Sequence, residues 1–311
     1  MTLKLTTNTH ILITGGTGFI GKALCTVLIQ SGCKVVVLTR SKQRALEHAA
    51  SQIEFIENLD QLDENAHFDV VINLAGEPIA QRWTHEAQAR ILESRLNTTK
   101  DLIIFFKRAK HKPDLLINGS AIGWYGTHRS DTFDESSVPS NDVIGKFSKE
   151  VCHKWEAEAL KVRALGIRTV ILRTGIVLEK GGGTLAQLIP PFNLGLGGPM
   201  GSCNQWFSWI HRDDLIGLIF HAIDNENIEG VINGTAPEPV TNKVFSKALG
   251  KAMKRPAFIP LPVFVLKTIF GQMADEIMLN GQKVLPKKSE ENGYIFKYAK
   301  IDLALEDIFK A

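Results

Sequence analysis

A glycine-rich stretch near the start of the chain carries residue types that can bind a phosphate. It reads TGGTGFIG, follows the apolar run HILI and leads into a helical pattern of apolar residues. Glycines let the main chain turn tightly and approach a pyrophosphate, whose charge is met by N–H groups at a helix N-terminus. The flanking strand and helix patterns favour a dinucleotide-binding turn over a merely structural one. The expected contacts are Gly15, Thr17, Gly18, Phe19, Ile20 and Gly21.

A charged residue, Arg40, ends the next apolar run, KVVVLTR. Arg40 stands nineteen residues after Gly21, where NAD-binding proteins usually place a carboxylate for the ribose 2′-hydroxyl. An arginine there can pair with a 2′-phosphate instead, and no carboxylate competes in the residues that follow, Ser41 to Arg44. The pattern predicts NADP(H) rather than NAD, with Arg40 and Ser41 as contacts. The alternative is that Arg40 only caps the strand end.

These positions need a sheet and helices to bring them together. Short apolar runs predict strands within 10–16, 34–40, 52–56, 69–76, 114–121, 167–175 and 230–237. Helical spacing predicts helices over 18–32, 41–50, 84–110 and 142–165, with Gly32 as a C-cap and Ser41 as an N-cap. This alternation predicts an α/β fold, a doubly wound parallel Rossmann sheet, with a smaller, mostly helical C-terminal lobe.

The pattern changes after Gly175, where glycines, prolines and aromatic residues interleave in a loop-rich stretch. We therefore expect a nucleotide-binding domain over residues 1–175 plus the strand near 230–234. A lobe that binds the substrate would comprise residues 176–229 and 235–311.

Composition narrows the class of protein. The chain has 311 residues, 44% of them hydrophobic, and a formal net charge of +3, with no clustered basic face that would predict nucleic-acid binding. Four cysteines without metal-ligand spacing predict free thiols, no metal site and a reducing compartment. No apolar run is long enough for a membrane span, and no signal-peptide pattern opens the chain. We expect a cytoplasmic protein with a small-molecule substrate and an open oligomeric state.

Five segments carry a family resemblance: TGGTGFIG, DVVINLAGEPI, INGSAIGWYG, RTGIVL and WIHRDDL. Together they resemble an extended-type short-chain dehydrogenase/reductase. More narrowly, the chain is similar to the atypical epimerase-family (YfcH-like) subgroup with a small C-terminal domain of unknown function. The resemblance implies about seven parallel strands and contacts to the nicotinamide half from Leu74, Ala75 and Gly76. It supplies no substrate.

The resemblance also locates the catalytic positions of that superfamily, where a Ser or Thr acts with a Tyr and a Lys. Ser120 matches the family serine, and Arg95 falls at the position of an upstream asparagine. Within GKFSKEVCHKWE, one register places Ser148 and Cys152 at the Tyr and Lys positions. A rival register places Glu150 and Lys154 there, and neither register contains a phenol.

Several further side chains have two interpretations. Cys152 is either a thiolate nucleophile or, as we prefer, a buried inert thiol. Tyr125 is either a substitute acid/base or aromatic packing, and Glu77 can face the nicotinamide as a base. Trp206, Phe207, Trp209 and His211 are expected to shape the substrate pocket. The sequence thus supports either an oxidoreductase or epimerase with an unusual acid/base group, or a non-catalytic NADP(H)-binding protein.

Overall fold

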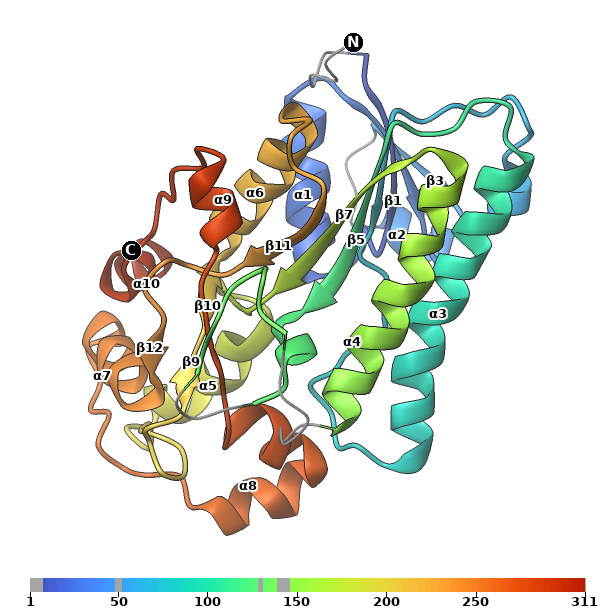
Figure 1. Ribbon diagram of the computed structural model, residues 1–311. Coiled ribbons are helices and arrows are strands. Elements are labelled where there is room, and N and C mark those ends of the chain that lie inside the picture. The colour runs from blue at the N-terminus through green and yellow to red at the C-terminus, as the bar shows by residue number, and fades with distance from the viewer. Residues whose placement is uncertain (1–7, 48–51, 128–130, 139–145, 311) are drawn as a thin grey trace.

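The centre of the protein is a parallel sheet of seven strands in the order β11-β7-β5-β4-β1-β2-β3 (Figure 1). We describe a computed structural model, which covers residues 8–47, 52–127, 131–138 and 146–310. The strands are β1 (His10–Thr14), β2 (Lys34–Leu38), β3 (Ile53–Ile56), β4 (Val70–Asn73), β5 (Leu115–Ala121), β7 (Arg168–Thr174) and β11 (Gly230–Gly234). The apolar residues of the central strands β1, β4, β5 and β7 are almost all buried, as the middle of a parallel sheet requires, and the outer strands are partly exposed. The predicted α/β fold class is confirmed.

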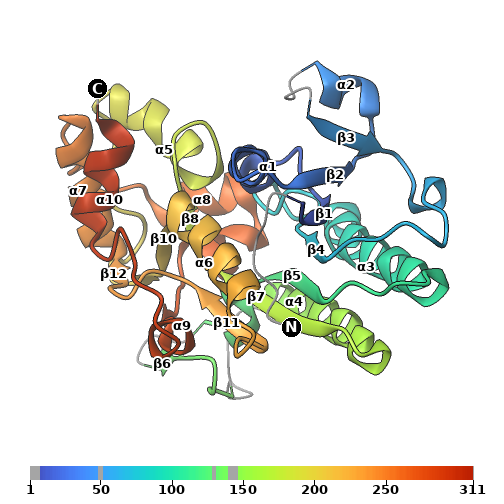
Figure 2. The same ribbon diagram turned by 90° about the horizontal axis from the view of Figure 1, so that it is seen from above.

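Helices cover both faces of this sheet (Figure 2). One face carries α1 (Phe19–Gln30), α2 (Lys42–Leu46) and α6 (Arg212–Asp224), whose apolar side chains share a core with the strands. The other face carries α3 (His85–Arg108) and α4 (Lys146–Ala159), which pack against each other. The sheet therefore presents only the ends of its strands for binding.

The ends of these helices follow from local chemistry. Thr84 caps α3, because its hydroxyl accepts the N–H of Ala87. The last turn of α1 closes at Ser31, and Gly32 follows at φ +82°. The N–H of Gly32 then bonds the carbonyl of Ile29, and that of Cys33 bonds the carbonyl of Leu28. The C-cap is thus Ser31, and Gly32, the predicted C-cap, occupies the left-handed position directly after it. Ser41 is the N-cap residue of α2, as predicted, but makes no side-chain capping bond.

A smaller lobe lies beside the sheet and is built mainly from the last third of the chain (Figure 1). Its helices are α5 (Gly183–Asn193), α7 (Asn242–Met253), α8 (Val263–Phe270), α9 (Lys287–Glu291) and α10 (Ile301–Phe309). Short strands pair within it or at its border: β6 (Thr132–Phe133), β8 (Ile176–Leu178), β9 (Trp206–Phe207), β10 (Trp209–His211), β12 (Val240–Thr241) and β13 (Lys283–Val284). None of the helices in the described part of the chain is long and apolar enough to cross a membrane.

Two boundaries differ from the expected ones. Helix α6 lies within 176–229, yet its apolar face is buried with α1 and the strands, so it belongs to the sheet's layers. The helix expected over 142–165 is α-helical from Lys146 to Ala159 and continues as a 3-10 helix to Leu165, while its first expected residues lie outside the described ones.

Candidate functional site

A cleft of about 1350 Å³ opens at the carboxyl ends of the strands. The glycine turn after β1, the residues after β2 and the loop after β4 line it. Predicted cofactor residues on its wall are Gly15, Thr17, Gly18, Arg40, Ser41, Leu74, Ala75 and Gly76. Phe19, Ile20 and Gly21 form the first turn of α1, and the Phe19 ring packs against Gly182. The strand order thus assembles in space what the sequence presents as separate motifs.

The glycine turn fits a pyrophosphate. Gly15 has φ +74°, and a Cβ built on it would lie 2.7 Å from the carbonyl carbon of Leu74. A Cβ on Gly21 would lie 2.2 Å from the Gly15 oxygen, so the turn and α1 touch without side chains between them. Among the described residues, no side chain caps α1 and no acidic residue lies in its first turn. Its N–H groups and helix dipole are therefore free to meet a phosphate.

Buried asparagines tie this turn to the next loop. The Thr14 hydroxyl donates to Asn73 Oδ1 at 2.5 Å and accepts the N–H of Ala75 at 3.2 Å. Asn73 Nδ2 donates to Asn118 Oδ1 at 2.7 Å and to the hydroxyl of Thr99 on α3 at 2.9 Å. None of the motifs in the sequence predicts this network directly. Its signal was an asparagine at the same point of two adjacent apolar strands, VVIN and LLIN.

Ser120 belongs to a buried ionic cluster. Its hydroxyl donates to Glu156 Oε1 at 2.6 Å. Arg173 donates to both carboxylate oxygens of Glu156, Nε to Oε1 at 2.9 Å and Nη2 to Oε2 at 2.8 Å. The guanidinium also lies over the ring of Trp124, 3.4 Å from its centroid. Because this bidentate pair holds the Glu156 carboxylate in place, Ser120 directs its proton to the carboxylate and its lone pairs elsewhere.

Ser148 and Cys152 lie on the buried face of α4 toward the short helix η2 (Ile122–Tyr125). A Cβ on Gly123 would lie 3.4 Å from Ser148 Cβ and 3.7 Å from Cys152 Sγ. The N–H of Ser148 donates to Glu276 Oε2 at 2.9 Å. Burial, with the charge of Glu156 adding to it, raises the pKa of Cys152 to about 11. A neutral thiol is therefore the resting form of this residue.

The rival register lies on the other side of α4. Lys154 Nζ and Glu150 Oε1 form an ion pair at 2.6 Å, and both side chains are about half exposed. These two groups satisfy each other at the surface. The helix thus turns Ser148 and Cys152 toward Ser120, and Glu150 and Lys154 toward solvent.

The thiol chemistry leads to a testable difference between two cysteines. We expect iodoacetamide at pH 8 to label the partly exposed Cys203 in the native protein and to leave Cys152 unlabelled. At that pH a pKa near 11 rather than 9 lowers the thiolate fraction about a hundredfold, and burial blocks access as well. Mass spectrometry of peptides, with urea-unfolded protein as the reference, measures both sites. Native labelling of Cys152 at the rate of Cys203 would revive it as a nucleophile.

Tyr125 and Trp209, expected as site residues, make contacts inside the core of the protein. Tyr125 is completely buried, and its hydroxyl donates to Asn233 Oδ1 at 2.9 Å. Burial also raises the pKa of Tyr125, so the structure favours the aromatic-packing interpretation of this residue over the acid/base one. Trp209 is completely buried in the small lobe and donates to the Glu238 carbonyl at 3.1 Å, so it is core rather than pocket wall.

His211 and Trp206 border the small lobe. His211 Nδ1 accepts the N–H of Asp213 at the start of α6, and its ring lies 4.0 Å from that of Tyr298. This buried histidine therefore joins α6 to the segment before α10, instead of lining a pocket. Trp206 is partly exposed, with Lys283 Nζ 5.0 Å from its ring centroid, and stays a predicted pocket residue.

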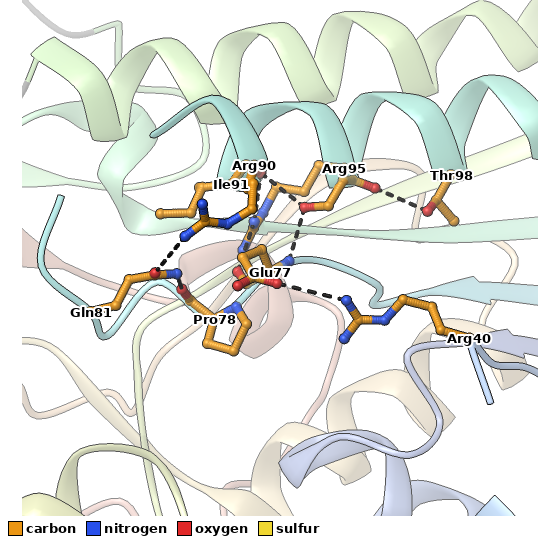
Figure 3. Close-up of polar contacts among 9 residues, drawn as sticks. Arg40, Glu77, Pro78, Gln81, Arg90, Ile91, Arg95 and Thr98 are labelled. Atoms are coloured by element: carbon orange, nitrogen blue, oxygen red, sulfur yellow. Dashed lines mark hydrogen bonds and ion pairs between the residues drawn. The ribbon is translucent and has the colours of Figure 1, made fainter. Parts of the chain in front are cut away.

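Arg95 holds the loop after β4 (Figure 3). Its Nη1 donates to the carbonyls of Glu77 at 3.1 Å and Ile91 at 2.8 Å. A Cβ on Gly76 would lie 2.6 Å from Arg95 Cζ, so only glycine lets the guanidinium pack there. The Glu77 carboxylate, in turn, lies 3.8 Å from Arg40 Nη1. A carboxylate therefore does lie beside Arg40, but it comes from the loop after another strand and not from the residues that follow Arg40 in the sequence.

Family comparisons agree with this architecture. The model of the NAD dependent epimerase/dehydratase family matches residues 11–233, and a domain of unknown function, DUF1731, matches residues 261–308. The chain belongs to the NAD dependent epimerase/dehydratase family. The resemblance that the motifs predicted, including the small C-terminal domain, is confirmed.

Individual relatives cover almost the whole chain. It is 40% identical over 96% of its length to an Arabidopsis thaliana protein named epimerase family protein SDR39U1 homolog, chloroplastic, and spans 86% of that protein. It is 38% identical to epimerase family protein YfhF of Bacillus subtilis, covering 96% of this chain and 97% of that one. Among solved structures, human epimerase family protein SDR39U1 with NADPH superposes with a TM-score of 0.87 at 35% identity, covering 97% and 99% of the two chains.

Proposed function

We propose that this protein binds NADP(H) in the cleft at the end of β1, β2 and β4. The observation that carries this proposal is the N-terminus of α1. No side chain caps it, and the glycine turn before it has no room for side chains. Arg40 stands at the end of β2 with its side chain 93% exposed, where it can receive a 2′-phosphate. The human relative crystallised with NADPH supports the same cofactor.

Replacing Arg40 by glutamine is expected to weaken NADPH binding about tenfold and to leave NADH binding nearly unchanged. Only the 2′-phosphate differs between the two cofactors, and a guanidinium–phosphate pair is a charge-assisted contact. Fluorescence titration of both cofactors measures the effect, and Arg44→Gln, on α2 at the same cleft, is the matched control. Equal cofactor preference in the wild type and in Arg40→Gln would refute this role of Arg40.

The reaction class that the site supports is hydride transfer at an alcohol or carbonyl carbon. A nicotinamide bound in the cleft would accept or supply the hydride. Ser120 would accept a hydrogen bond from a substrate hydroxyl and pass its own proton to Glu156 Oε1, 2.6 Å away. Arg173 positions the Glu156 carboxylate beside Ser120 through two hydrogen bonds. In this proposal Ser148 and Cys152 shape the wall beside η2, and Arg95 positions the loop after β4.

A second candidate function is cofactor binding without turnover. The neutral Cys152 and the engaged Tyr125 favour it, because neither offers the proton chemistry of a free phenol. A panel of alcohols, aldehydes, ketones and nucleotide sugars, assayed for gain or loss of NADPH absorbance, separates the two functions. Turnover that Ser120→Ala abolishes while NADPH still binds supports the enzyme. Binding without turnover of any compound supports the second function.

A further inference from the structure

An ion pair crosses the mouth of the cofactor cleft. Arg40 follows β2 and Glu77 follows β4, and β1 separates these two strands in the sheet. Arg40 Nη1 nevertheless lies 3.8 Å from Glu77 Oε2, so the two side chains meet beyond the end of β1 (Figure 3). Both residues line the same cleft as the glycine turn. The pair therefore occupies the space that an adenosine ribose and its substituents would reach.

The two partners differ in how firmly they are held. The backbone of Glu77 is fixed on both sides, because its N–H donates to Ser94 Oγ at 2.9 Å and its carbonyl accepts from Arg95 at 3.1 Å. Its side chain is 23% exposed, whereas that of Arg40 is 93% exposed. The backbone of Glu77 is thus anchored to residues of α3, and its side chain is the more buried of the two partners, whereas the side chain of Arg40 extends into solvent.

We propose that Glu77 is a specificity-determining residue that competes with the cofactor's 2′-phosphate for Arg40. The inference rests on the proposed binding of NADP(H). A 2′-phosphate that pairs with Arg40 either displaces the Glu77 carboxylate from Nη1 or binds beside it through the other guanidinium nitrogens, and in both cases it meets the negative charge of Glu77. A 2′-hydroxyl carries no charge and leaves the ion pair in place. Glu77 therefore weakens binding of phosphorylated cofactors and has little influence on the others.

This role of Glu77 differs from the one that the sequence suggests, in which Glu77 faces the nicotinamide and acts as a base. The contact with Arg40 places the carboxylate at the end of β2, where the ribose 2′ position is expected. A role at the adenosine end can be tested separately. A cofactor fragment that lacks the nicotinamide should show the same change in affinity on substitution of Glu77 as the whole cofactor does.

The test compares Glu77→Gln with the wild type in titrations of NADPH, NADH and adenosine 2′,5′-bisphosphate at low ionic strength. Glutamine keeps the size of the side chain and the two backbone anchors of the loop. We expect NADPH and the bisphosphate to bind about three- to fivefold more tightly and NADH to change less than twofold, in keeping with a solvent-exposed ion pair. In an Arg40→Gln background the same change should have less than half of this effect.

Glu57→Gln is the matched control for a general loss of negative charge. Glu57 lines the same cleft, and its Oε1 accepts the N–H of Lys42 at 2.8 Å, a contact that glutamine can keep. We expect it to strengthen NADPH binding less than Glu77→Gln does. Three results would each overturn the inference. The first is that Glu77→Gln binds all three ligands more weakly than the wild type does. The others are that Glu57→Gln strengthens NADPH binding as much as Glu77→Gln does, or that Glu77→Gln keeps its full effect on NADPH binding in the Arg40→Gln background. If Arg40→Gln leaves NADPH binding unchanged in otherwise wild-type protein, the proposed role of Arg40 fails first, which distinguishes the two failures.

Discussion

Replacing Arg173 by methionine is expected to lower the free energy of unfolding by about 3–5 kcal/mol, because it leaves a buried carboxylate without its counter-charge. Glu156 and Arg173 have side chains 6% and 4% exposed, and two hydrogen bonds join them. Methionine fills much of the volume beside Trp124 but cannot donate to Glu156. Urea unfolding followed by circular dichroism measures the change.

The control substitution lies on α4, the helix that carries Glu156. Lys154→Met removes the cation of the pair with Glu150, which is about half exposed, and should cost about 0.5 kcal/mol or less. Adding Glu156→Gln to Arg173→Met should recover part of the lost stability, because the buried charge is then gone. A loss below about 1 kcal/mol in Arg173→Met would mean that the buried Glu156 side chain does not depend on Arg173, which would contradict the importance of this pair for stability.

Replacing Gly15 by alanine is expected to abolish NADPH binding, with an affinity loss of at least about a hundredfold. The residue needs φ +74°, and its Cβ would lie 2.7 Å from both the carbonyl carbon and the oxygen of Leu74. Because backbone on both sides must shift, the glycine turn and the loop after β4 would separate at the point where they line the cleft. Titration of the folded variant with NADPH measures the loss.

Gly166→Ala is the control that separates the loss of NADPH affinity in Gly15→Ala from the effect of backbone strain alone. Gly166 has φ +79°, but a Cβ there would meet nothing within 4 Å, and the residue lies before β7 rather than at the cleft. We expect it to cost about 1–2 kcal/mol in stability and nothing in NADPH affinity. Wild-type affinity in Gly15→Ala would contradict the placement of the cofactor.

Much of the fold could be predicted because its signals are local. The buried strands carry their own apolar runs, and Thr84 and Gly32 mark helix ends through bonds to near neighbours. The glycine turn is equally local, since its chemistry lies in the backbone from Gly15 to Gly21. Cofactor contacts by individual residues stay predictions.

The parts that could not be predicted depend on residues that meet only after folding. Nothing near Arg40 in the sequence indicates Glu77, which arrives from two strands away in the sheet. Glu156 and Arg173 come from α4 and β7, and only their packing makes them a buried pair. The sequence predicts Trp209 as a pocket residue because it stands in a loop-rich stretch where glycines, prolines and aromatic residues interleave. The strand instead turns its ring into the core of the small lobe.

A structure of this protein with NADPH tests the central claim most directly. We expect the pyrophosphate at the N-terminus of α1, over Gly16 to Phe19, and the 2′-phosphate within hydrogen-bonding distance of Arg40, with Glu77 no longer paired to Arg40. A cofactor bound outside this cleft, or a 2′-phosphate that points away from Arg40, would contradict it.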